Sequence, residues 1–406
     1  MGLKDLRIEF DNQWSTYYPG QTVRGNVIVV LDSTKKIRGI SVKIKGEANT
    51  WCVVKKEDIE RKGDYHDEVA TAHEEYFETK YYLVGSASGG EIEIQSGEHK
   101  FPFTCSLPMN LPSSFESEFG YIRYIVKATL DRPWKFDHEA KSLFTVVVPL
   151  DLNQEPRAAE PVQQEMSKTF CCLCCGTPPL TVNFSLPARG YVPGQTMPIK
   201  INVENLSNVV VTVIKLMLRE VVTVRVTDPS ETRIQERVIA EVSKGPIQAG
   251  GTADYEQHLN VPPLPPSNSF ATCQYIDLEY ELKVEACVEG CSQYCRYHRN
   301  LSAKIPILVG TVPLSVHHAP SAPPAGIDGD YTERRPLEVG FVIPSANTAV
   351  PPLPESTLYP NLPPPSFEES SYAAKNFREK EESEYVYGLG KHFAPRYPVY
   401  NFAPAQ

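Results

Sequence analysis

Residues 17–23 read Tyr-Tyr-Pro-Gly-Gln-Thr-Val, and 174 positions later residues 191–197 read Tyr-Val-Pro-Gly-Gln-Thr-Met. Pro-Gly between two extended runs predicts a tight turn, because proline holds φ at about −65° and glycine accepts a positive φ. Each copy is flanked by alternating apolar and polar residues, as in Leu6 and Ile8 before the first turn and Val27 and Val29 after it. The stretch therefore predicts a strand–turn–strand unit that occurs twice.

A second pair of similar stretches lies near the end of each half. Residues 120–128 read Gly-Tyr-Ile-Arg-Tyr-Ile-Val-Lys-Ala, and residues 275–284 read Tyr-Ile-Asp-Leu-Glu-Tyr-Glu-Leu-Lys-Val. Two ordered matches at similar separation, first 174 and then about 155 positions, are typical of a duplicated unit. We therefore predict two domains of one fold.

The period of the hydrophobic pattern within each half is two. Alternation is clear at Ile40, Val42 and Ile44, and the period is typical of antiparallel strands with one buried face. No amphipathic helix of any length is indicated, so the predicted fold class is all-β, with two tandem immunoglobulin-type β-sandwiches. The predicted boundaries are an N-terminal domain at 1–150, a connector with a cysteine cluster at 151–175, a C-terminal domain at 176–315 and a tail at 316–406.

The tail differs in composition from the two halves. It holds 15 of the 36 prolines and 7 of the 21 tyrosines, no cysteine and few aliphatic residues. Such a segment buries too little apolar surface to offset its ordering entropy, so we predict disorder over 316–406.

Charge and hydropathy exclude several classes of protein. The formal net charge of −10 argues against broad nucleic-acid binding, which requires a cationic face. The first residues carry no apolar leader, and no apolar run is long enough to cross a bilayer. We therefore expect a cytoplasmic protein whose ten cysteines are thiols or metal ligands rather than disulfides.

The repeated motifs resemble a known family. Residues 17–29 follow the form Tyr-x-Pro-Gly-x-x-Val-x-Gly-x-Val-x-Val, and residues 120–134 end in Asp-Arg-Pro-Trp. With the second Pro-Gly turn, they resemble the arrestin-domain-containing proteins, the α-arrestins, over about residues 1–315. The resemblance implies two arrestin sandwiches docked end to end and a non-enzymatic adaptor for transmembrane cargo. It also implies a cytoplasmic protein recruited to the plasma membrane and endosomes.

The resemblance further implies tail motifs of the form Pro-Pro-x-Tyr that bind WW domains of HECT-type ubiquitin ligases. This chain has no such motif, and Phe367 stands where the tyrosine belongs. A WW groove holds two prolines as a polyproline II helix and takes the next aromatic ring in an adjacent slot. Phenylalanine fills that slot but loses a hydroxyl hydrogen bond of about 0.5–1.5 kcal/mol. The candidate ligase-binding residues, in two proline-rich segments, are Pro351, Pro352, Leu353, Pro354, Pro364, Pro365 and Phe367.

Cysteines gather at two places. The first cluster is Cys171, Cys172, Cys174 and Cys175, where S-palmitoylation, metal ligation and unmodified thiols are all open readings. The second is Cys287, Cys291, Cys295 and His298, a donor set that suits zinc but has spacing unlike the usual C-x2-C pairs. Zinc binding at this loop and unligated thiols are the two alternative interpretations, and no other cofactor is indicated.

Lysines on and near one predicted strand form a local cationic zone. The candidate contacts for acidic or phosphorylated cargo are Lys43, Lys45, Lys55 and Lys56, although charged residues on an outward strand face are also ordinary. No P-loop, H-E-x-x-H or G-x-S-x-G motif occurs, and Ala87 occupies the nucleophile position of the nearest match. The alternative to a ligase adaptor is a ubiquitin-independent cargo-sorting or signalling scaffold of arrestin fold.

Overall fold

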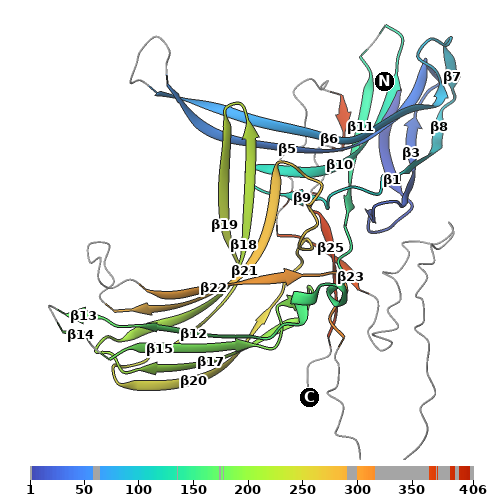
Figure 1. Cartoon of the computed structure of the whole chain (residues 1–406). Helices are drawn as coiled ribbons and strands as arrows, with labels where there is room; N and C mark the ends of the chain where they lie inside the picture. The colour runs from blue at the N-terminus through green and yellow to red at the C-terminus, as the bar shows by residue number, and fades with distance from the viewer. Residues whose placement is uncertain are drawn as a thin grey trace, which may run out of the picture.

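A computed structural model of the chain describes residues 2–57, 65–134, 136–172, 175–176, 178–289, 300–315, 365–371, 373, 385–388 and 393–402 (Figure 1). Within these ranges nearly every element is a strand, and the only helices are two short 3-10 turns, η1 (Leu152–Gln154) and η2 (Pro156–Ala159). The predicted all-β fold of two tandem sandwiches is confirmed.

The N-terminal sandwich consists of two mainly antiparallel sheets packed face to face. The first contains three strands, β1 (Leu3–Phe10), β3 (Thr22–Leu31) and β8 (Gly97–Ser106). The second has the order β2 (Thr16–Tyr17), β11 (His138–Val146), β10 (Gly120–Asp131), β5 (Gly39–Glu57) and β6 (Tyr65–Gly85). The short strand β9 (Phe115–Glu116) pairs with β10, and β4 (Lys35–Ile37) pairs with β7 (Ile92–Ile94).

The C-terminal sandwich repeats this arrangement. Its first sheet has the order β12 (Val162–Lys168), β15 (Leu180–Leu186), β17 (Thr196–Asn205) and β20 (Gly251–Asn260). Its second sheet has the order β16 (Gly190–Tyr191), β22 (Leu301–Val309), β21 (Ile276–Val288), β18 (Val211–Thr227) and β19 (Ser230–Lys244). Burial alternates strictly along β15, where Val182 and Phe184 enter the core and Asn183 and Ser185 face outward. The sequence alternation therefore decides which side of each sheet is buried.

The two Pro-Gly turns have matching local geometry, which supports the predicted duplication. Gly20 and Gly194 have φ of +80° and +86°, conformations that glycine adopts without steric cost. In the first turn the Gln21 side-chain oxygen accepts from the Tyr18 amide at 3.0 Å, and in the second Gln195 accepts from the Val192 amide at 3.1 Å. The strand before each turn, β2 or β16, pairs in parallel with the last strand of its own domain.

A buried tyrosine is also placed equivalently in both domains. Tyr124 on β10 donates its hydroxyl to the Pro112 carbonyl at 2.6 Å, and Tyr280 on β21 donates to the Pro265 carbonyl at 2.9 Å. Both rings are buried in the apolar core. The looser of the two sequence repeats thus marks the same structural position twice.

Two expectations about boundaries need correction. The connector predicted at 151–175 contains β12, which is the edge strand of the second domain, because Val162 and Met166 turn into its core. The tail predicted as disordered contains three ordered segments, β23 (Ser366–Glu369), β24 (Val386–Tyr387) and β25 (Arg396–Val399). Their aromatic side chains bury apolar surface against the two domains, a contact that composition does not reveal.

Candidate docking site at the domain junction

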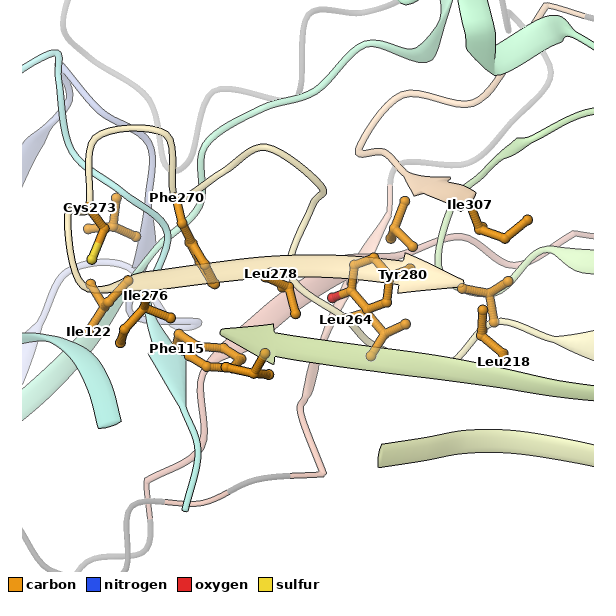
Figure 2. Close-up of a cluster of buried hydrophobic side chains, with 14 of the residues drawn as sticks. Phe115, Ile122, Leu218, Leu264, Phe270, Cys273, Ile276, Leu278, Tyr280 and Ile307 are labelled. Atoms are coloured by element: carbon orange, nitrogen blue, oxygen red, sulfur yellow. The ribbon is translucent and has the colours of Figure 1, made fainter. Parts of the chain in front are cut away.

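The two sandwiches share a continuous apolar junction (Figure 2). Phe115 and Ile122 of the first domain lie beside Phe270, Cys273 and Ile276 of the second, and all five side chains are buried. The rings of Phe115 and Phe270 have centroids 5.0 Å apart. Because this cluster is contiguous with the core of each sandwich, the described domains form one packed body.

A second contact is made by the two long hairpins. The hairpin of β18 and β19 reaches the hairpin of β5 and β6 (Figure 1). Thr50 donates its hydroxyl to the Arg225 carbonyl at 2.7 Å, and Thr227 donates to the Thr71 carbonyl at 3.2 Å. Val226 packs there with Val54. The extended strand lengths therefore serve the contact between domains.

A buried ion pair lies beside the junction. Arg123 holds Glu116 through two hydrogen bonds, Nε to Oε1 at 2.6 Å and Nη2 to Oε2 at 2.9 Å, and its guanidinium lies 3.7 Å from the Tyr121 ring centroid. Burial raises the pKa of the Glu116 carboxyl above its ordinary value, and Arg123 opposes that rise. Both charges are shielded from water, and the pair holds β9 against β10.

The C-terminal strand β25 attaches to the first domain at one end. The Arg396 amide donates to Thr145 Oγ1 at 3.2 Å, and the Tyr397 hydroxyl donates to the Ser114 carbonyl at 2.7 Å. Tyr397 is 1% exposed, and burial raises the pKa of its hydroxyl well above the ordinary value. The hydroxyl therefore stays protonated and remains a donor to Ser114.

The other end of the same segment attaches to the second domain. The Tyr400 amide donates to the Pro193 carbonyl at 3.0 Å, and its hydroxyl donates to the Thr311 carbonyl at 2.7 Å. A Cβ added at Gly194 would overlap the Tyr400 backbone carbonyl, so the second Pro-Gly turn lies in direct contact with the tail. Phe402 packs against the same apolar cluster. Figure 1 shows β25 lying between the two domains.

Only part of the predicted ligase-binding set lies within the described residues. Pro365 is half-buried, and Phe367 is 9% exposed in a cluster with Trp14, Tyr18 and Tyr397. Pro351, Pro352, Leu353, Pro354 and Pro364 lie outside the described residues. The structure thus packs the aromatic position of the candidate motif against the first domain.

The predicted cargo-binding lysines are partly neutralised. Lys43 pairs with Glu78 at 2.5 Å, and Lys45 pairs with Glu47 at 3.0 Å. Lys55 is exposed near the end of β5, while the side chain of Lys56 lies outside the described part. A role in cargo binding therefore remains a prediction for this set.

The two cysteine clusters are described only in part. Cys171 and Cys172 form β13 and pair with β14 (Cys175–Gly176), with Cys172 opposite Cys175, while Cys174 lies outside the described residues. In the second cluster Cys287 Sγ accepts from the Asn300 side chain at 3.4 Å, and Cys291, Cys295 and His298 lie outside the described residues. Among the residues that are described, no group of three or more metal-ligating side chains is found. Acylation and zinc binding both stay predictions.

Sequence reasoning did not identify the docking of the C-terminal tyrosines. The signal available was the spacing of Tyr397 and Tyr400, three positions apart around Pro398 and Val399. That spacing places one ring on each domain, but the carbonyls that receive the hydroxyls come from Ser114 and Thr311, far away in sequence.

Two tandem antiparallel sandwiches joined by an apolar junction define a protein of the arrestin fold. The family described as "Arrestin (or S-antigen), N-terminal domain" matches residues 6–153, and "Arrestin (or S-antigen), C-terminal domain" matches residues 177–314. The chain belongs to the arrestin domain-containing proteins, the α-arrestin family. Members of this family are known as adaptors rather than enzymes.

Named relatives agree with this assignment. The chain is 28% identical to "Arrestin domain-containing protein 17" of Caenorhabditis elegans, covering 98% of this chain and 99% of the relative. It is 27% identical to "Arrestin domain-containing protein 4" of Mus musculus, covering 77% of this chain and 73% of the relative. It is 28% identical to "Arrestin domain-containing protein 1" of Homo sapiens, covering 77% and 65% respectively. Neither of the helices that the structure describes has the length and apolarity that a bilayer span requires.

Proposed function

We propose that the chain is a non-enzymatic trafficking adaptor that links transmembrane receptor or transporter cargo to WW-domain HECT-type ubiquitin ligases. The observation that carries the proposal is a Pro-Pro-x-Phe sequence at residues 364–367 attached to an arrestin body of two docked sandwiches. The body offers extended surfaces for cargo, and the tail offers the ligase motif. The expected result of such a link is ubiquitination, endocytosis and sorting or degradation of the cargo at the plasma membrane and endosomes.

The chemistry of the tail motif supports ligase binding. Consecutive prolines favour polyproline II, so little conformational entropy is lost when they enter an aromatic-lined WW groove. The second segment at residues 351–354 provides another proline pair about a dozen positions earlier. Two weak sites on one chain increase the affinity for tandem WW domains through effective concentration.

Cargo and membrane contacts complete the proposal. Lys55 and Lys56 are proposed to contact acidic cargo tails, and Lys43 and Lys45 join them only by exchanging their present carboxylate partners. Acylation within residues 171–175 is proposed to hold the protein at the membrane surface, since one acyl chain adds marginal, reversible binding to other contacts.

One observation favours the second candidate, a cargo-sorting scaffold that works without ubiquitin ligases. Phe367 is 9% exposed and packs on the first domain, which is a structural role that requires no WW partner. In this second candidate function the tail has only a structural role in the packed body, and cargo sorting depends on the two sandwiches alone.

Peptide binding separates the two candidates. A synthetic peptide of residues 358–371 is titrated onto isolated WW domains of HECT-type ligases, with Pro365→Ala as the negative control and Phe367→Tyr as the gain variant. The ligase adaptor predicts measurable binding, loss with Pro365→Ala, and a gain of about two- to tenfold with Phe367→Tyr, because one hydroxyl hydrogen bond is restored. No binding by the native peptide or by the Phe367→Tyr peptide would favour the scaffold.

A further inference from the structure

The strand that carries Phe367 depends on the C-terminal tyrosines for its position. Within the described residues β23 pairs only with β25, four residues against four, with Phe367 opposite Pro398. An isolated two-stranded ribbon is marginally stable in water. The ribbon is therefore held by the side chains that anchor it, above all Tyr397 and Tyr400.

The packing of Phe367 is incompatible with its use as a ligase contact. Its ring centroid lies 6.2 Å from that of Trp14, and the side chain is enclosed by Tyr18, Val147 and Tyr397. A WW groove needs the same ring in its own aromatic slot and the preceding backbone as polyproline II. The two arrangements exclude each other, because one side chain cannot occupy both places.

The domain junction holds this segment through two main-chain carbonyls, which accept from two buried tyrosine hydroxyls. Tyr397 donates to the Ser114 carbonyl and Tyr400 to the Thr311 carbonyl, so each domain supplies one main-chain acceptor. Arg396 adds an ion pair with Glu369 at 2.8 Å that ties the two strands of the ribbon together. An extended segment with tyrosines at positions i and i+3 satisfies both acceptors, whereas one without hydroxyls leaves buried carbonyls unpaired.

We propose that residues 393–402 form a detachable clasp, which fills a Tyr-x-x-Tyr binding groove between the domains and thereby masks Phe367. The inference rests on the proposed ligase role of Phe367 and adds how that role is regulated: ligase binding requires release of the clasp. The apparent affinity of the whole chain for a WW domain equals the affinity of the free motif reduced by the fraction of molecules with the clasp open. By thermodynamic linkage, a WW domain bound to the motif opens the clasp to the same degree.

The test compares full-length proteins on two readouts. Full-length native protein and a full-length Tyr397→Ala, Tyr400→Ala double variant are titrated with the WW domain that binds the 358–371 peptide most tightly. We expect the native protein to bind at least about tenfold more weakly than the peptide and the double variant to approach the peptide affinity. Amide hydrogen exchange over 366–369 is measured on both proteins, and faster exchange is expected in the double variant.

A control variant tests whether the effect is specific to the clasp. Tyr385→Ala removes another tail tyrosine, 47% exposed and packed on His138 away from the clasp, and should leave both readouts unchanged. Equal WW affinity of native protein and double variant, with unchanged exchange over 366–369, would overturn the clasp. If the peptide itself does not bind, the ligase role proposed for Phe367 fails. Amide hydrogen exchange alone then tests the clasp. Faster exchange over 366–369 in the double variant supports the clasp, and unchanged exchange refutes it.

Discussion

Phe115 and Phe270, one from each domain and 155 positions apart, pack in a tilted arrangement with their ring centroids 5.0 Å apart at an interplanar angle of 56°. Each ring is 2% exposed and belongs to the core cluster that runs through both sandwiches. We therefore expect the pair to couple the stability of the two domains, because each ring buries apolar surface against the other.

Replacing Phe270 with alanine should destabilise the whole body. Loss of a buried phenylalanine costs about 3–5 kcal/mol through lost transfer free energy and the cavity left behind. Urea unfolding followed by far-UV circular dichroism, which reports the strands of both domains, should show a lower midpoint, with the two domains tending to unfold in separate steps. Phe136→Ala, at a side chain that is 75% exposed, is the control and should change the free energy of unfolding by less than about 0.5 kcal/mol. An unchanged midpoint for Phe270→Ala would contradict the junction.

Replacing Arg123 with methionine should be more harmful than removing the whole ion pair. The single variant leaves the Glu116 carboxylate buried without its partner, and breaking a buried pair this way costs about 3–5 kcal/mol. Adding Glu116→Leu removes that stranded charge, so the double variant should recover most of the native stability. Equilibrium denaturation of the native protein, the Arg123→Met and Glu116→Leu single variants and the double variant measures the coupling. Equal stability of single and double variants would show that the pair has no such role.

His138 should make the stability of the folded chain depend on pH. Its ring makes edge contacts with Tyr385 and Tyr387 at centroid distances of 5.4 and 6.1 Å. Burial, and then the nearby charges of Arg132 and Lys35, lower the pKa of His138 to about 4. The folded state thus binds fewer protons than the unfolded state, whose imidazole titrates at about 6.5. Its contribution to stability is full above about 6.5 and is lost as the pH falls through about 4.

Thermal unfolding at a series of pH values checks this expectation. The native protein should lose more stability between pH 6.5 and 4 than a His138→Phe variant, which keeps an aromatic ring but has no titrating group. Other groups titrate in the same window, so the difference between the two profiles is the measured quantity. Parallel profiles would show that His138 is not responsible.

Alanine at Gly194 should release the tail, whereas alanine at Gly20 should not. Both positions have a positive φ, so both variants carry a backbone strain of about 1–2 kcal/mol. At Gly194 the new Cβ also meets the Tyr400 carbonyl, but at Gly20 it meets the flexible side chain of Met109. Limited proteolysis should therefore cleave the C-terminal segment faster in Gly194→Ala only. Equal cleavage of the two variants would argue that the second turn does not seat the tail.

The duplication was readable from the sequence because its signals are local. Pro-Gly turns, a period of two and a repeated tyrosine context all act within about ten residues, and each recurs in the second half. The observed φ values at Gly20 and Gly194 and the paired hydroxyl bonds of Tyr124 and Tyr280 match that reading.

The connector was misjudged because β12 is an edge strand. Its outward face carries Gln163, Glu165 and Ser167, so the polar character of the segment hid the two buried positions, Val162 and Met166. An edge strand needs only one paired neighbour and few apolar contacts, which weakens the alternation that sequence reasoning relies on.

Local patterns were enough to predict the all-β class, the two copies of one domain and the proline-rich motif, since these depend on local backbone preferences and on which residues avoid water. The positions of Phe367, Tyr397 and Tyr400 depend on the folded molecule instead. The carbonyl that receives Tyr397 is 283 positions away and the one that receives Tyr400 is 89 positions away, and Phe367 packs on rings of the first domain. Composition records how much apolar surface a tail carries, but only the assembled junction provides a place to bury it.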